Sequence, residues 1–242
     1  MLHRSTQQAA ARREFDWRHP SILTAVPATL LVLSGIIMFA LYIALDVTAS
    51  LAYDGYNYKD QTISELSAIG APTRAYWLAL SPVYQILAFA FAVGVLRVAG
   101  ERRPVRVAGW LLLALAVVGL LWWIAPMHRR EVLAADDGTW QDVMHLVVGG
   151  VTSLLYFVLI GVGAFAFGRW FRLYSFATIV ALLVFGTLMS FETGGVGENE
   201  PTPWLGIYER IAVEGSMLWQ AVFAVVLLRY ARKWRTAGPA IR

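Results

Sequence analysis

Residues Ile207–Gln220 read IYERIAVEGSMLWQ, and this stretch opens the last long apolar segment of the chain. It contains Glu209, Arg210 and Glu214 where a membrane helix ordinarily has no charged residue. An ionisable side chain in the middle of a bilayer costs roughly 3 kcal/mol, so such residues usually face partners inside a helix bundle and are candidates for function. We therefore predict that these three side chains meet polar groups from other parts of the chain.

The composition is typical of an integral membrane protein. Hydrophobic residues make up 58% of the 242 residues and charged residues 15%. Soluble domains contain about 25% charged residues. A span needs about 20 apolar residues, so this length accommodates six membrane helices. The chain has no cysteine, which excludes disulfides, thiolate catalysis and cysteine-ligated metal centres.

Six apolar runs predict an all-α membrane protein, a bundle of six transmembrane helices. The predicted spans are Ser21–Leu45, Tyr76–Leu96, Val107–Ala125, Val143–Phe167, Leu173–Phe191 and Gly206–Leu228. We divide the chain into a tail (residues 1–20), a single transmembrane domain (21–230) and a second tail (231–242). Glycines and serine in the fourth span allow close helix packing and predict a central place for that span.

A short interfacial helix is predicted after the first span. Thr62 precedes Glu65 by three residues, the spacing of a capping box, and Gly70 is a helix stop signal. Glu65 thus has two interpretations, a local cap or, with Ser64, a polar group at the outer mouth of the bundle. Both remain open at the level of sequence.

The distribution of basic residues predicts the orientation. Fifteen of the twenty lysines and arginines lie in the two tails and in the connections after the second and fourth spans. Cytoplasmic segments are enriched in these residues, so both termini are predicted to be cytoplasmic and the three long loops to face outside. The net charge of +4 reflects this topology, and we predict no nucleic-acid partner.

Four motifs are similar to those of a known family. They are TISELSAIGAP (Thr62–Pro72), PMH (Pro126–His128), D-x-x-H (Asp142–His145) and ERIAVEGSMLW (Glu209–Trp219). Their order and spacing resemble a bacterial membrane family, domain of unknown function 998, from the first span to Leu228. The resemblance implies a six-helix, multi-pass protein of a bacterial plasma membrane. It implies no activity. Six-helix proteins of the Frag and autophagy-modulator group offer a more distant analogy, of fold alone.

We predict one outer polar cluster of candidate ligand-binding residues. Its members are Glu65, His128, His145, Glu209, Arg210 and Glu214. Arg210 and Glu214 are four residues apart, a spacing that allows an ion pair on one helix face. Asp142 either caps the fourth span with Thr139 or orients His145, three residues later, as a general base or metal ligand.

Zinc is the one cofactor that this set of side chains indicates. His128 and His145, with a carboxylate, have the ligand types of a zinc site, although the chain has neither an HExxH nor an HxxxH motif. This absence separates the chain from membrane hydrolases with seven helices and a three-histidine zinc site.

Three functions remain open. The first is binding or transport of a lipid or small amphipathic ligand in an outward-facing polar pocket. The second is an outward-facing hydrolase or lipid-headgroup enzyme, metal-assisted or not, with His145, Asp142 and Glu214 as catalytic candidates. The third is a structural or accessory subunit. Membrane lipids are the expected partners, and the sequence leaves the ligand, protein partners and oligomeric state open.

Overall fold

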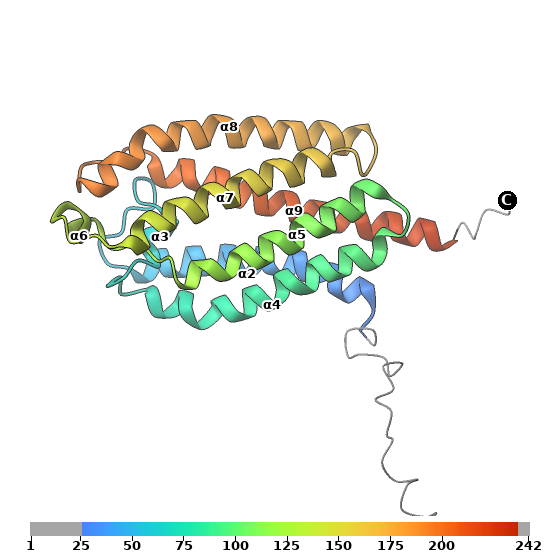
Figure 1. Ribbon diagram of the computed structural model, residues 1–242, viewed down its shortest axis with the longest axis horizontal. Coiled ribbons are helices and arrows are strands. Elements are labelled where there is room, and N and C mark those ends of the chain that lie inside the picture. Colours follow the sequence, from blue (N-terminus) through green and yellow to red (C-terminus); the bar gives the residue numbers. More distant parts are fainter. Residues whose placement is uncertain (1–25, 237–242) are drawn as a thin grey trace, which may run out of the picture.

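Six long helices form a closed ring in the computed structural model, which describes residues 26–236, with side chains up to residue 231. They are α2 (Ala28–Ala52), α4 (Arg74–Ala99), α5 (Arg103–Gly119), α7 (Trp140–Gly163), α8 (Arg169–Gly197) and α9 (Leu205–Thr236). Each packs against the next in this order, and α9 closes the ring on α2 (Figure 1). All six are long and apolar enough to cross a membrane, α5 together with the 3₁₀ turn that continues it to Trp123, which confirms the predicted fold class.

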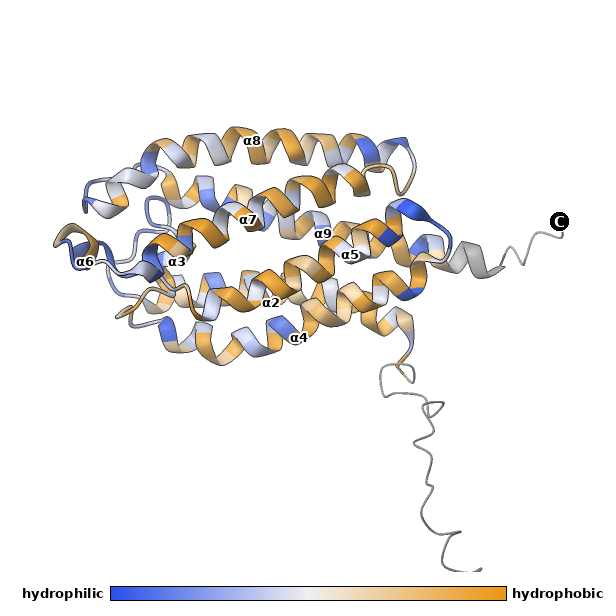
Figure 2. Ribbon diagram, in the orientation of Figure 1, coloured by the Kyte–Doolittle hydropathy of each residue, from blue (hydrophilic) through white to orange (hydrophobic). Residues whose placement is uncertain are grey.

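The two ends of the bundle differ (Figure 1). One end, which we call the loop end, has the three long connections. The first contains α3 (Ile63–Leu66), and the second contains the 3₁₀ helix η1 (Leu120–Trp123) and α6 (Arg130–Ala134). The other, basic end has the two short turns, with Arg102, Arg103, Arg169 and Arg172. Between them, hydrophobic residues cover the flanks (Figure 2). Which end faces the cytoplasm stays a prediction from the basic residues.

The first span continues beyond its predicted end. We placed that end at Leu45, and the structure extends α2 to Ala52. The start of the prediction, residues 21–25, lies outside the described residues. Asp46 marks the end of the apolar run in the sequence, but its side chain is 0% exposed inside the bundle and paired with a cation. A charge with a buried partner does not end a helix, so the predicted boundary was wrong.

The most buried helix is α9. Of its most apolar stretch 44% is buried, against 22% for α7, the helix of the fourth span, which the sequence predicts to be central. Two of the α7 glycines explain the error, since a Cβ added at Gly150 or Gly161 would meet nothing within 4 Å, and only Gly163 packs tightly, against the Trp219 ring of α9. The backbones of two helices approach closely at Gly94 of α4, where a Cβ would lie 2.7 Å from the Leu31 carbonyl carbon of α2.

The main apolar core fills the half of the bundle toward the basic end. Trp219 and Phe223 of α9 stack with ring centroids 5.2 Å apart, and both are 0% exposed. The Trp219 indole donates a hydrogen bond to Ser175 Oγ of α8 (2.9 Å). The inward face of α9 is therefore mainly apolar in this half, and its buried charged residues, Glu209 and Arg210, lie in the half toward the loop end.

Gly206 sits where the first loop presses on the start of α9. A Cβ at this position would overlap the carbonyl oxygens of Tyr58 and Gln61, which are backbone atoms and cannot turn aside. We expect Gly206→Ala to lower the free energy of unfolding by about 1–3 kcal/mol, the usual cost of overpacking. Gly215→Ala on the same helix is the control, because its Cβ has open space. Denaturant unfolding in detergent compares them, and equal stabilities would contradict the prediction.

Candidate functional site

Arg210 forms a buried, two-pronged ion pair with Asp46. Its Nε and Nη2 each lie 2.9 Å from one carboxylate oxygen, and the two side chains are 4% and 0% exposed. The pair joins α9 to α2, the last and first helices of the ring. The two parallel hydrogen bonds match the planar shapes of a guanidinium and a carboxylate. They also pair two buried charges with each other.

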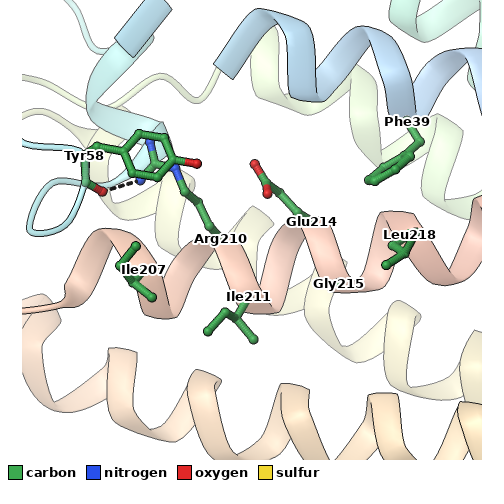
Figure 3. A pocket seen from close by; sticks show the side chains of 8 residues that line it. All are labelled: Phe39, Tyr58, Ile207, Arg210, Ile211, Glu214, Gly215 and Leu218. Atoms are coloured by element: carbon green, nitrogen blue, oxygen red, sulfur yellow. Dashed lines mark hydrogen bonds between the residues drawn. The ribbon is translucent and has the colours of Figure 1, made fainter. Parts of the chain in front are cut away.

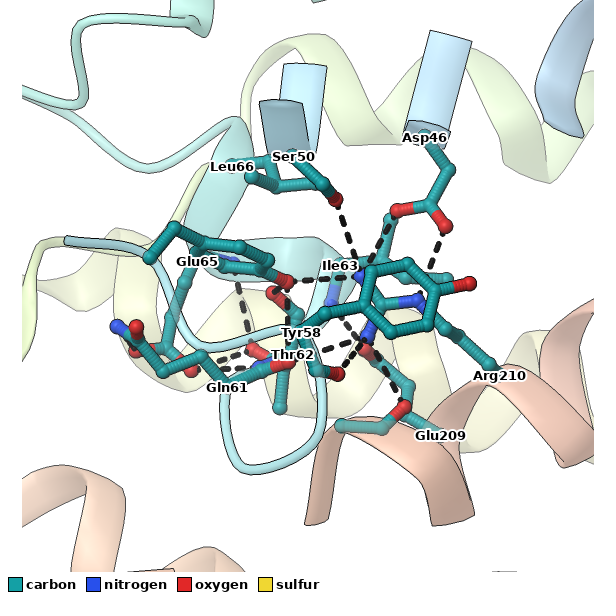
Figure 4. Close-up of polar contacts among 12 residues, drawn as sticks. Asp46, Ser50, Tyr58, Gln61, Thr62, Ile63, Glu65, Leu66, Glu209 and Arg210 are labelled. Carbon is teal, nitrogen blue, oxygen red and sulfur yellow. Dashed lines mark hydrogen bonds and ion pairs between the residues drawn. The ribbon is translucent and has the colours of Figure 1, made fainter. Parts of the chain in front are cut away.

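The other N–H groups of Arg210 hold the first loop (Figure 4). Nη1 donates to the carbonyl oxygens of Tyr58 (2.9 Å), Gln61 (3.2 Å) and Gly206 (3.1 Å), and Nη2 donates to the Tyr56 hydroxyl (2.9 Å). The Tyr58 ring covers the guanidinium at 3.5 Å from Cζ to the ring centroid. An arginine has five N–H donors, so all are in use. The predicted Arg210–Glu214 ion pair was wrong, because Arg210 pairs with Asp46.

Glu209, the neighbour of Arg210, holds the short helix α3. Its carboxylate accepts hydrogen bonds from the Ile63 amide and from Ser64 Oγ (3.0 Å). Free amides at a helix start attract a negative charge, which explains why the acid faces α3. Glu209 is 8% exposed, so it is committed to this contact.

Glu65 takes part in a second buried ion pair. It completes the predicted capping box with Thr62, which is confirmed, and Arg130 binds it at 2.5 Å (Nε–Oε1) and 2.9 Å (Nη2–Oε2). Arg130 also donates to the Thr202 hydroxyl (2.8 Å) and to the Glu200 carbonyl (3.1 Å). One guanidinium therefore ties together all three long loops.

The pKa of Glu65 reflects these contacts. Burial raises it, but the hydrogen bonds from Arg130 and from the Thr62 amide outweigh burial and hold the pKa below its usual value. Glu65 is therefore ionised at neutral pH and forms a full ion pair with Arg130.

The histidines have surroundings of their own. Asp142 accepts from the His128 amide (2.7 Å) and lies 2.9 Å from His128 Nδ1, and it also completes a capping box with Thr139. His145 Nδ1 lies 2.9 Å from the Ala125 carbonyl, so that nitrogen bears the proton. The predicted cap is confirmed, whereas the histidine that Asp142 orients is His128 and not His145.

The predicted site residues thus form separate groups. Glu65, Glu209 and Arg210 meet at α3 and the first loop, and Glu214 lies beside Arg210 on α9. His128 and His145 lie elsewhere. Within residues 26–231 no three His, Asp or Glu side chains are grouped as a metal site would need. Zinc binding by His128 and His145 stays a prediction, which metal analysis of the purified protein tests.

Glu214 lines a pocket on the flank of the bundle. The flank pocket, as we call it, has a volume of about 330 Å³ and is lined by Phe39, Tyr58, Ile207, Arg210, Ile211, Glu214, Gly215 and Leu218. The Glu214 carboxylate points toward α2, between Tyr58 and Phe39 (Figure 3). Leu218 is 43% exposed, whereas Trp219 beside it is buried, so the pocket opens outward and not into the core.

Comparison with known proteins places the chain in a family. The family model described as "Protein of unknown function (DUF998)" matches residues 36–226. The chain belongs to this family. The matched range of this DUF998 protein includes both buried ion pairs and every residue of the flank pocket. No curated protein and no solved structure matches the chain.

The two buried ion pairs of this DUF998 protein are formed by four residues, and sequence reasoning missed two of them, Asp46 and Arg130. Asp46 had a detectable signal, because the uncharged residues after it, VTASLA, continue the helix. Arg130 had none, since it follows Arg129 in a polar loop and nothing local shows which of the two is buried. Tyr58 and Phe39 were likewise missed as pocket residues because their partners are distant in sequence.

Proposed function

We propose that this protein binds a lipid or another small amphipathic ligand in the flank pocket, at the end of the bundle that faces outside the cell. The pocket is the observation that supports the proposal. Its wall is apolar, formed by Phe39, Ile207, Ile211 and Leu218, and its polar end has Glu214 and Arg210. Ligand pockets typically combine an apolar lining with a few polar groups that fix orientation.

The position of the pocket favours a ligand from the bilayer over one from water. It lies between two membrane helices, α2 and α9, and opens on a flank where Leu218 is exposed. An acyl chain would lie against the apolar wall while a headgroup reaches the polar end near the first loop. Binding is the step that a lipid-binding protein and a lipid transporter share.

Filling the pocket should abolish binding. Gly215 lines it, and a Cβ there meets no atom within 4 Å, so the side chain of Gly215→Leu begins in open space and extends into the pocket. Gly186→Leu on α8 is the matched control, because Gly186 has the same open surroundings away from the pocket. We expect photoactivatable single-chain lipids in nanodiscs to label residues 207–218 of the wild type and of Gly186→Leu.

Labelling of this peptide should fall at least about tenfold in Gly215→Leu, since a filled pocket leaves no room for the chain. Mass spectrometry of the digested protein measures the labelled fraction. Equal labelling of the two leucine variants, or none in the wild type, would show that the pocket holds no lipid.

A further inference from the structure

We propose that the headgroup recognised in the flank pocket is a cation, an alkylammonium, and that Glu214 is the residue that binds it. This inference rests on the proposed function and specifies its ligand. It follows from three features of the pocket, which are the charges around Glu214, the occupied state of Arg210 and the shape of the apolar wall.

Negative charge exceeds positive charge around the pocket. The electrostatic neighbours of Glu214 are the carboxylates of Asp46 and Glu209 and the guanidinium of Arg210. Three acids thus share one base, and that base forms its ion pair with Asp46. In the part of the chain whose side chains are described, Glu214 forms no ion pair with a lysine, arginine or histidine. A bound ammonium would supply the cation that Glu214 lacks.

Arg210 is not free to bind an anionic headgroup. All of its N–H groups already donate to Asp46, to the Tyr56 hydroxyl and to backbone carbonyls, and the Tyr58 ring covers one face of the guanidinium. Glu209 is turned away toward α3. Glu214 is therefore the charged group that the pocket offers to a ligand, and it attracts cations.

The pocket suits a headgroup with one chain. A volume of about 330 Å³ is near the lower limit for ligand pockets. Glu214 stands between Tyr58 on the loop side and Phe39 on the other (Figure 3). An ammonium at Glu214 would place the start of its alkyl chain against Phe39 and Leu218, with the remainder in the bilayer beside α9.

A bound proton is the rival explanation for Glu214. The Asp46 carboxylate acts on Glu214 as a hydrogen-bond neighbour and as a like charge, so a protonated Glu214 would also relieve the excess of negative charge. Glutamine has the shape of a protonated glutamate but no charge. Glu214→Gln therefore separates the two explanations, because it removes ammonium binding and leaves a protonated state nearly unchanged.

The test uses three photoactivatable probes with the same hexadecyl chain and different headgroups, namely trimethylammonium, sulfate and hydroxyl. They are applied to the full-length protein in nanodiscs, and labelling of residues 207–218 is measured. We expect the ammonium probe to label at least about tenfold more than the sulfate probe, because opposite charges a few ångströms apart attract strongly near a protein surface. In Glu214→Gln its labelling should fall to that of the hydroxyl probe, and Glu214→Asp should restore part of it.

Glu198→Gln is the control, since Glu198 is an exposed acid of the same end outside the pocket. It should leave labelling by all three probes unchanged.

A fourth probe, with an ethanolamine-phosphate headgroup, identifies the source of the cation. If it labels as strongly as the trimethylammonium probe, the natural ligand is a phospholipid. If it labels more weakly, the natural ligand is a simple amine. Equal labelling by ammonium and sulfate, or an ammonium signal that survives Glu214→Gln, overturns cation recognition while leaving lipid binding intact. Lipid binding itself is tested by Gly215→Leu, so the two failures are distinguishable.

Discussion

Replacing Arg210 by methionine should lower the free energy of unfolding by about 3–5 kcal/mol, the range observed when one partner of a buried ion pair is removed. The variant leaves Asp46 charged and 0% exposed. It also leaves the carbonyl oxygens of Tyr58 and Gln61 without their donor. Denaturant unfolding in detergent micelles, followed by tryptophan fluorescence, measures the effect.

A double-mutant cycle identifies the partner of Arg210. Combining Arg210→Met with Asp46→Asn should cost clearly less than the sum of the two single changes, because the second removes the charge that the first leaves unpaired. The same cycle with Glu214→Gln should show a smaller coupling, since Glu214 is an electrostatic neighbour of Arg210 and not its ion-pair partner. Strong coupling to Glu214 and additive effects with Asp46 would contradict the structure.

Arg130→Met should have the second largest effect, about 3 kcal/mol, because it removes the guanidinium that joins the three long loops. Glu65 would lose its ion pair inside the loop end, and Thr202 and the Glu200 carbonyl would lose their donor. Unfolding in detergent measures the stability, and limited proteolysis shows whether the loops separate before the helices do.

Arg129→Met is the matched control for Arg130→Met. Arg129 is the preceding residue, its side chain is 42% exposed, and its partner Glu131 is 64% exposed. An exposed ion pair contributes about 0–1 kcal/mol, so this change should be small. Similar losses for both arginines would show that the loops are held by something other than the Glu65–Arg130 pair.

The loop contacts also give the stability a dependence on pH. The pKa of Glu65 is lowered in the folded state, so its contribution is complete above the usual glutamate pKa. The contribution weakens as the pH falls below that value and is lost once the pH passes the lowered pKa. The stability difference between wild type and Glu65→Gln should therefore shrink on acidification.

Local features of the fold could be predicted from the sequence, and contacts between distant segments could not. Six apolar runs predicted six helices, because each run alone is long enough to span a bilayer. The Thr62–Glu65 capping box and the Thr139–Asp142 cap, each one of two interpretations of the sequence, are both formed, since their partners are three residues apart. Asp46 and Arg210 are 164 residues apart, and no sequence pattern indicates which acid meets which base across that distance.

The same limit applies to the candidate site. Intramembrane charge singled out Glu209, Arg210 and Glu214 as residues that need partners, and this physical reasoning holds for the first two. Helical spacing then chose Glu214 for Arg210 and His145 for Asp142. Residues three or four apart on a helix can reach each other, but a partner from another segment can reach the same side chain. Asp46 binds Arg210 in this way, and His128 binds Asp142.

The Arg210–Asp46 pair closes the ring between its first and last helices, and this has a consequence for biosynthesis. Asp46 leaves the ribosome 164 residues before Arg210, which at about 5–20 residues per second is roughly 8–33 s. During that time the first helix has an acid and no matching base. Asp46 lies two turns from the end of α2, near enough to the surface for water or headgroups to hydrate it meanwhile. The joint between α2 and α9, beside which the flank pocket lies, thus cannot form until the last helix of the ring has been made.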